Sequence, residues 1–223
     1  MKNFFKPSLI RLRFFWLEYF TRLRKKDFAT IKSKRVPVVL VAGIYAGGRS
    51  LLPMKHFLES KGYPVYLALE QKNWEPVPIL AKRLQRQISC LPAKHVQIVA
   101  HSMGGITTLA ALRDKKVLSK VKQIITLGSP LNGCPLGSVA FWERGKNQKY
   151  LASNSKIIKR LNSNPKINRK IRSLCASFDE IVFPQKVSRL RGAKENYKLP
   201  ISGHASLILA EEVWEEILKR LVQ

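Results

Sequence analysis

A serine set in a tight-turn motif is the residue whose surroundings most clearly indicate chemistry. Ser102 lies in the run Ala100-His101-Ser102-Met103-Gly104, with a small residue two positions before it and a glycine two positions after it. A turn of this kind, between a strand and a helix, strains the serine backbone and exposes its hydroxyl as a nucleophile. The Met103 amide, at the start of the helix, would then face the oxyanion that forms on an attacked carbonyl group. The alternative is a buried strand followed by a small-residue helix that only packs.

A serine nucleophile needs a base that takes its proton and an acid that orients the base. Among the four histidines, His204 is our candidate for the base, because it follows a glycine in a loop after the last predicted strand. Asp179 directly follows another predicted strand and is our candidate for the acid, with Glu180 and Glu143 as alternatives. The chain order of serine, acid and histidine is the order found with this serine turn. In the purely structural alternative, His204 caps the last helix and Asp179 only ends a strand.

Apolar runs alternate with helical patterns from residue 36 to the end of the chain. The predicted strands cover residues 36–42, 65–69, 95–100, 121–127, 173–177 and 193–198. Helices are predicted at 51–58 and 77–91, directly after Ser102, and after His204. The pattern predicts one α/β domain over residues 36–223, in which right-handed crossovers place helices around a mostly parallel sheet.

Residues 131–170 interrupt this rhythm before the strand that leads to Asp179. The segment is rich in glycine and proline and has an apolar island at 139–142. A long irregular insertion at this place predicts an active-site lid or a wall that binds an acyl chain. Phe141 and Trp142 in the insertion, and Tyr45 in the glycine-rich loop 43–48, are our candidates for substrate contacts. The alternative is a disordered basic loop.

The charge balance of the chain is strongly basic. There are 41 lysines and arginines against 14 aspartates and glutamates, which gives a formal net charge of +27. Such a surface attracts phosphate, either in nucleic acid or in anionic lipid headgroups. No motif that combines aromatic and basic residues for the recognition of nucleic-acid bases stands out in the sequence. A specific nucleic-acid partner is therefore not predicted. A generally basic, solvated surface is the alternative.

The first 35 residues form an amphipathic, aromatic-rich extension ahead of the domain. One helical face is apolar and consists of Leu9, Leu12, Trp16, Phe20 and Leu23. A basic helix with tryptophan and phenylalanine suits the surface of an anionic membrane, so residues 1–26 are predicted to make peripheral membrane contact. The alternative is a helix that packs its apolar face on the domain.

Targeting signals and cysteines give the expected compartment. Charged residues interrupt the N-terminal apolar stretch and no small-residue cleavage site follows, which argues against a cleavable signal peptide. The three cysteines are scattered and show no metal-ligand spacing, which favours free thiols in a reducing compartment. The protein is therefore predicted to be cytoplasmic, with peripheral contact to a membrane.

From about residue 36 to its end, the chain resembles the small bacterial lipases of the α/β-hydrolase superfamily. Their serine turn also reads Ala-His-Ser-Met-Gly, as residues 100–104 do here. The similarity extends to the runs 41–44, 126–128 and 179–182 and to Gly203-His204. The N-terminal 35 residues lie outside the resemblance.

The resemblance implies an α/β-hydrolase fold with Ser102 as nucleophile, Asp179 as acid and His204 as base. It implies an oxyanion hole made by the backbone amides of Ile44 and Met103. The implied activity is hydrolysis of a lipid or small acyl ester through an acyl-serine intermediate, with no metal or organic cofactor. An acyltransferase or thioesterase with the same three residues is the nearest alternative. A non-catalytic protein of this fold that binds membranes is a more distant one.

Overall fold

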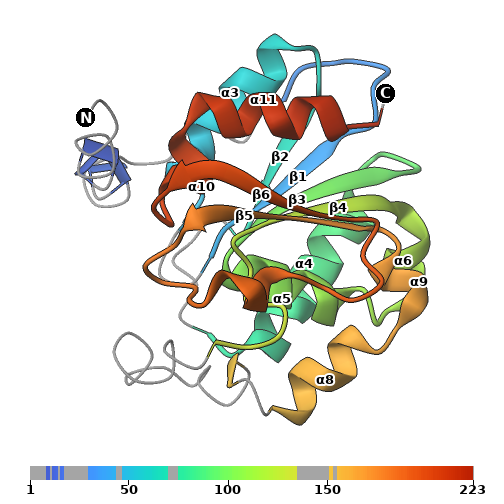
Figure 1. The fold of residues 1–223 in the computed structure, drawn as a ribbon. Helices are drawn as coiled ribbons and strands as arrows, with labels where there is room; N and C mark the ends of the chain where they lie inside the picture. Colours follow the sequence, from blue (N-terminus) through green and yellow to red (C-terminus); the bar gives the residue numbers. More distant parts are fainter. Residues whose placement is uncertain are drawn as a thin grey trace.

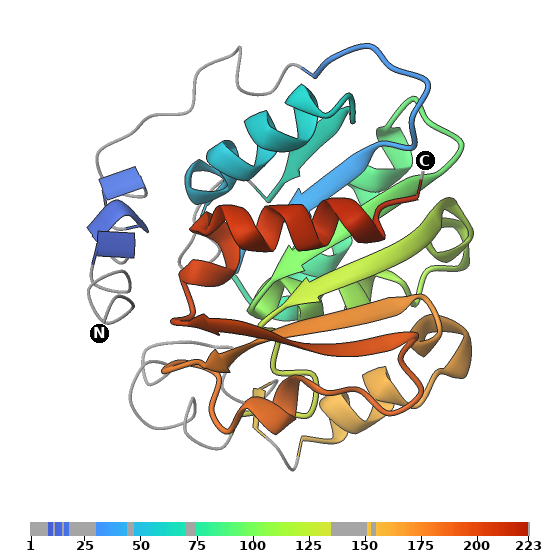
Figure 2. The same cartoon turned by 45° about the horizontal axis from the view of Figure 1, so that its top comes forward.

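The computed structural model shows a single sheet covered by helices on both faces (Figure 1). It describes residues 9–10, 12–14, 16–17, 30–43, 47–69, 75–134, 151–152 and 155–222. Figure 2 shows the same fold with its top turned forward, so that helices of one face lie in front of the strands. The predicted α/β architecture is therefore confirmed.

The sheet has six strands, and all neighbouring pairs are parallel. The strands are β1 (Val38–Val41), β2 (Val65–Ala68), β3 (Val96–His101), β4 (Val121–Leu127), β5 (Ile171–Phe178) and β6 (Glu195–Ser202). Their spatial order is β2-β1-β3-β4-β5-β6. In a parallel sheet the carboxyl ends of all strands lie at the same edge, and loops there commonly carry the functional residues of open α/β sheets.

Helices cover both faces of the sheet (Figure 1). On one face lie α4 (Val77–Cys90), α5 (Met103–Ala111), α6 (Lys115–Lys120), α8 (Lys156–Asn162) and α9 (Pro165–Asn168). On the other face lie α3 (Leu52–Ser60), α10 (Ser206–Leu209) and α11 (Glu211–Arg220). Two short 3₁₀ helices, η1 (Arg49–Leu51) and η2 (Gln185–Ser188), lie in connecting segments.

The apolar run of the first strand follows from its burial on both faces. Val39 and Val41 belong to the core on the α4–α5 side, whereas Val38 and Leu40 belong to the core on the α3–α11 side. Successive side chains of a strand point to opposite faces, so a strand covered on both sides is apolar at every position. This is why the sequence reads there as a continuous apolar run rather than as an alternating one.

The structure has one strand that is longer than expected from the sequence and short helices that were not expected. The strand predicted at 193–198 starts at Glu195 and continues to Ser202, so it ends two residues before His204. Two short helices, α6 and α9, were not expected, and both are capped by a side chain at their N-terminus, that of Asp114 and that of Asn164. Part of the predicted insertion is helical, in α8 and α9, while residues 135–150 lie outside the described residues.

The N-terminal residues that the structure describes have two apolar sides. Ile10, Phe14 and Leu17 are half-buried against the core on the α3–α11 side. The opposite side is exposed, with exposed fractions of 66% for Leu9, 65% for Leu12 and 56% for Trp16. Among the described residues, no helix has the length and apolar character that crossing a bilayer requires.

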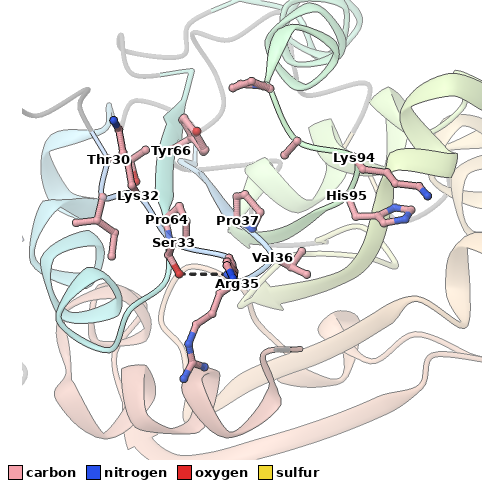
Figure 3. A pocket seen from close by; sticks show the side chains of 14 residues that line it. Thr30, Lys32, Ser33, Arg35, Val36, Pro37, Pro64, Tyr66, Lys94 and His95 are labelled. Atoms are coloured by element: carbon pink, nitrogen blue, oxygen red, sulfur yellow. Dashed lines mark hydrogen bonds between the residues drawn. The ribbon is translucent and has the colours of Figure 1, made fainter.

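A cavity of about 480 Å³ lies where three strands begin (Figure 3). Its walls include Pro37, Pro64 and His95, which directly precede β1, β2 and β3. Lys32 and Lys94 lie on opposite sides of it in Figure 3. Because Ser102, Asp179 and His204 follow the carboxyl ends of strands, this cavity lies at the other end of the sheet and is not part of their site.

Candidate active site

Ser102 occupies a strained turn between β3 and α5. Its backbone has φ +56° and ψ −128°, and among the described residues only one other non-glycine residue, Leu69, has a positive φ. Its amide donates a hydrogen bond to the carbonyl of Leu127 at the end of β4 (2.9 Å), and its carbonyl accepts one from Gly105 (3.0 Å). Residues held in this backbone region concentrate at functional sites, where the surrounding structure enforces the strain. The turn expected from the sequence is therefore present at Ser102.

The glycine after the turn is required by close backbone contact. A Cβ atom on Gly104 would lie 2.6 Å from the carbonyl oxygen of Ala42 and 2.7 Å from that of Val41. These distances are shorter than any real Cβ contact, and the obstacle is backbone that cannot rotate away. Gly104 thus lets the first turn of α5 lie directly against the end of β1, which brings Gly43 beside Ser102.

Asp179 and His204 form a hydrogen-bonded pair at the ends of β5 and β6. His204 Nδ1 lies 2.7 Å from Asp179 Oδ2, and Asp179 is 1% exposed. The other carboxylate oxygen accepts hydrogen bonds from the amides of Ile181 (2.9 Å) and Val182 (2.8 Å). Burial alone would raise the pKa of Asp179, but the hydrogen bond and charge of His204 and these two amides outweigh it and lower the pKa. Asp179 is therefore held as an ionised acceptor facing the imidazole.

The end of β4 connects this pair to the serine. Gly128 has φ +54°, and a Cβ atom on it would lie 3.0 Å from Asp179 Oδ2 and 3.4 Å from His204 Cε1. The residue before it, Leu127, accepts the hydrogen bond from the Ser102 amide. The described contacts thus join Asp179 and His204 directly and link Ser102 to them through Leu127, the last residue of β4, and Gly128, which follows it.

Glu180, an alternative candidate for the acid, contacts the main chain of His204 rather than its ring. The amide of His204 donates a hydrogen bond to Glu180 Oε2 at 3.0 Å. Glu143, the other alternative, lies outside the described residues. Of the two neighbouring carboxylates, only that of Asp179 forms a hydrogen bond with the His204 imidazole.

His101 makes a contact that sequence reasoning missed. Its Nε2–H donates to the carbonyl oxygen of His204 at 3.3 Å, and the two imidazole rings lie 4.5 Å apart between centroids. Burial, followed by the charge of His204, lowers the pKa of His101 from 6.5 to about 3. His101 is therefore a neutral donor at any pH near neutrality. The sequence shows that His101 directly precedes Ser102, but nothing in it indicates a contact with His204, which lies 103 positions later.

The predicted oxyanion and substrate contacts are described only in part. Met103 is the first residue of α5, and the first amides of a helix have no acceptor within the helix. Ile44 and Tyr45 lie outside the described residues, as do Phe141 and Trp142. The two oxyanion donors and the three substrate contacts stay predictions.

Metal-ligating residues do not cluster in the part of the chain that the structure describes. No group of three or more His, Cys, Asp or Glu side chains there could hold a metal ion. The cysteines Cys90, Cys134 and Cys175 are free thiols. The thiol of Cys134 donates to the carbonyls of Ile181 (3.6 Å) and Phe183 (3.4 Å), and so fastens the turn that follows Asp179.

The sequence of the chain matches the model of a known protein family. A family model described as PGAP1-like alpha/beta domain matches residues 80–194, which is more than half of the chain and includes the strained serine. The chain belongs to this family. The match to the PGAP1-like domain runs from α4 through β5 and the Asp179 turn to the residue before β6.

Solved α/β-hydrolase structures share the fold of this PGAP1-like domain. Bacillus licheniformis lipase BlEst2 in mature form has a TM-score of 0.69 and 16% identity over 86% of this chain and 94% of that chain. Aspergillus fumigatus lipase B has a TM-score of 0.67 and 17% identity over 82% and 51%. The thioesterase domain from the curacin biosynthetic pathway has a TM-score of 0.57 and 15% identity over 85% and 93%. Likeness at these identities shows the fold alone, and it confirms the predicted α/β-hydrolase fold.

The substitution His101→Gln should flatten the dependence of stability on pH. The folded protein keeps His101 neutral down to about pH 3, whereas the unfolded chain protonates it near the ordinary pKa of 6.5. The unfolded state therefore binds more protons in this window, and the free energy of unfolding falls by about 1.4 kcal/mol per pH unit as the solution is acidified. Glutamine does not titrate and keeps an N–H donor. Urea unfolding between about pH 6.5 and pH 4 measures both slopes, and equal slopes would contradict the assignment.

Proposed function

We propose that this PGAP1-like domain is a serine hydrolase that cleaves carboxylic ester bonds of lipids. The observation that carries the proposal is the hydrogen bond of the partly exposed His204 to the buried Asp179, linked through the end of β4 to a serine in a strained turn. A nucleophile, a base and an acid from three separate loops constitute the functional unit of a serine hydrolase. The Asp179–His204 hydrogen bond and the strained Ser102 turn at the same edge of an α/β-hydrolase sheet support ester hydrolysis over a purely structural role.

In the proposed mechanism His204 acts as general base. Because its Nδ1 is hydrogen-bonded to Asp179, that nitrogen carries the proton and Nε2 is left to accept the proton of the Ser102 hydroxyl. Ser102 Oγ then attacks the acyl carbonyl. Asp179, whose pKa is lowered, stays ionised and stabilises the imidazolium that forms.

The remaining steps use the backbone and a water molecule. The amides of Met103 and Ile44 would stabilise the oxyanion of the tetrahedral intermediate. Collapse of the intermediate expels the alcohol, which takes the proton from His204, and leaves an acyl-serine. A water molecule, deprotonated by His204, then attacks this ester, and the carboxylic acid leaves as Ser102 recovers its proton.

Exposed aromatic side chains beside the acid support an apolar substrate. Phe178 and Phe183 precede and follow the turn of residues 179–182 and are 52% and 40% exposed. The carbonyl of Phe178 accepts a hydrogen bond from Gly203, the residue before His204 (2.8 Å). Large apolar groups at the rim of a site offer an acyl chain a surface that excludes water. Two of the similar structures named above are lipases, which agrees with a lipid ester as substrate.

A thioesterase or an acyltransferase is the second candidate, because the same three residues can release an acyl group from sulfur or pass it to an alcohol. The thioesterase domain from the curacin pathway shares the fold. Product analysis with an ester and a thioester of the same acyl chain, with and without an added alcohol, separates these activities.

We further propose that the N-terminal residues contact an anionic membrane surface. The exposed side formed by Leu9, Leu12 and Trp16 is apolar and includes a tryptophan, while the chain carries a net charge of +27. Apolar insertion and attraction to anionic lipids act together on such helices. In this proposal the protein is a peripheral cytoplasmic enzyme, and the described side of Ile10, Phe14 and Leu17 packs on the domain.

The substitution Ser102→Ala tests the proposed reaction. It removes the nucleophile and should lower kcat for p-nitrophenyl esters by a factor on the order of 10⁴–10⁶, because the triad acts as a unit. Labelling by a fluorophosphonate probe should disappear together with activity. Ester hydrolysis at the wild-type rate in the folded variant would refute the mechanism. Absence of labelling and activity in the wild type would favour the non-catalytic alternative.

Replacing Phe178 and Phe183 by serine tests the apolar surface. We expect kcat/KM for a long-chain acyl ester to fall about tenfold, which corresponds to about 1.4 kcal/mol of lost apolar contact. The value for an acetyl ester should change by less than about twofold, because its chain is too short to reach the phenyl groups. Ile79→Ser, at an exposed apolar residue of α4, is the matched control. Equal losses for both esters would show that the two phenylalanines are structural.

The triple variant Leu9→Ser, Leu12→Ser, Trp16→Ser tests the membrane contact. Its co-sedimentation with vesicles that contain phosphatidylglycerol should be at least about tenfold weaker than that of the wild type, because it loses the three exposed apolar side chains of this side. Wild-type binding should weaken at high salt and on purely phosphatidylcholine vesicles. Unchanged vesicle binding by the triple variant would refute the role of this surface, with Ile79→Ser again as control.

A further inference from the structure

The His204 backbone is held on both sides by side chains outside the proposed triad. The amide donates to Glu180 Oε2 at 3.0 Å, and the carbonyl accepts from His101 Nε2 at 3.3 Å. With the ring bonded to Asp179 at 2.7 Å, His204 is held at three separate points. We propose that Glu180 and His101 are positioning residues that fix the main chain of His204, so that its imidazole is aimed at Ser102. The proposal rests on the serine-hydrolase function proposed above.

The position of His204 in the fold creates the need for such contacts. It lies between β6, which ends at Ser202, and the short helix α10, which begins at Ser206, and it follows Gly203 with φ +100°. One hydrogen bond from Nδ1 fixes a point of the ring, but it leaves the ring free to pivot about that point if the backbone moves. A displacement of about 1 Å in a reacting group lowers the rate by a factor on the order of 10². Fixing the two peptide groups of His204 removes this freedom.

Glu180 is suited to the amide side because it follows Asp179 directly. The Asp179 carboxylate turns inward and is anchored by two amides of its own loop, so the next residue lies beside the same histidine. A hydrogen bond from an amide to an ionised carboxylate is stronger than one between neutral groups. Two consecutive side chains thus bind His204: that of Asp179 binds the ring, and that of Glu180 binds the backbone amide.

His101 is suited to the carbonyl side because it precedes Ser102 directly. It is 4% exposed at the end of β3, where strand hydrogen bonds fix its backbone. Its contact with the His204 carbonyl therefore ties the loop of the base to the strand that carries the nucleophile. Because burial keeps the ring neutral, His101 places no positive charge next to the imidazolium that forms on His204 during the reaction.

The decisive comparison is between Glu180→Ala and Glu180→Gln. Alanine cannot accept the hydrogen bond, and its kcat should fall about 10- to 100-fold while KM changes by less than about threefold. Glutamine retains a carbonyl oxygen that accepts from the amide and should restore most of that loss. Glu212→Ala, which removes an exposed carboxylate from α11, is the matched control and should keep the wild-type kcat. Thermal unfolding of each variant shows that the folded protein is being compared.

A second pair of variants keeps the proposal open to refutation if Glu180→Ala fails to fold. His101→Phe preserves a ring but has no donor and should lose kcat, whereas His101→Gln retains an N–H donor and should recover part of it. Wild-type kcat in Glu180→Ala, or equal losses in the alanine and glutamine variants, would overturn the role of Glu180. Equal kcat in the two His101 variants would overturn that of His101. Ser102→Ala separates these outcomes from failure of the proposed function, since an active Ser102→Ala protein would remove the mechanism altogether.

Discussion

The hydrogen bond between His204 and Asp179 is the interaction on which the candidate site depends. Its acceptor is a carboxylate that is 1% exposed, so the site must supply the stabilisation that water would otherwise give. Two amides of its own loop and the imidazole do so, and they keep the pKa of Asp179 low despite burial. Loss of the histidine would leave a buried charge with fewer partners, and loss of the aspartate would leave an imidazole without orientation. The histidine thus stabilises the buried carboxylate, and the carboxylate orients the imidazole.

The sheet explains why this pair lies near a serine 77 residues before Asp179 in the chain. β3, β4, β5 and β6 are neighbours, and all four end at the same edge. The Ser102 turn follows β3, Gly128 follows β4, Asp179 follows β5 and His204 closes the loop after β6. Parallel pairing brings these loops together without any contact between residues close in sequence. The apolar strand β1 pairs with β3, and its carboxyl end lies against Gly104 in the first turn of α5.

The sequence allowed the architecture to be predicted because its signals are local. The strand at 121–127 could be read from its apolar residues alone, and it is β4 with the same bounds. The turn at Ser102 could be read from the small residues around it. By contrast, the contacts of His101 and Glu180 with His204 depend on where a loop lies in space, and they join residues 103 and 24 positions apart. The helix α6 was overlooked for another reason: its signal, an Asp114 cap before six residues, is local but too short to be distinguished from a turn.

The backbone of Ser102 has a consequence for how this protein could change over evolutionary time. A non-glycine residue held with φ +56° and ψ −128° costs about 1–3 kcal/mol in strain, and glycine at the same place would relieve most of it. Backbone strain alone thus favours a glycine at residue 102, whereas the proposed reaction requires the serine. If the proposed nucleophilic role of Ser102 were no longer selected for, a substitution of this residue by glycine would raise the stability of the fold while it removed the proposed reaction.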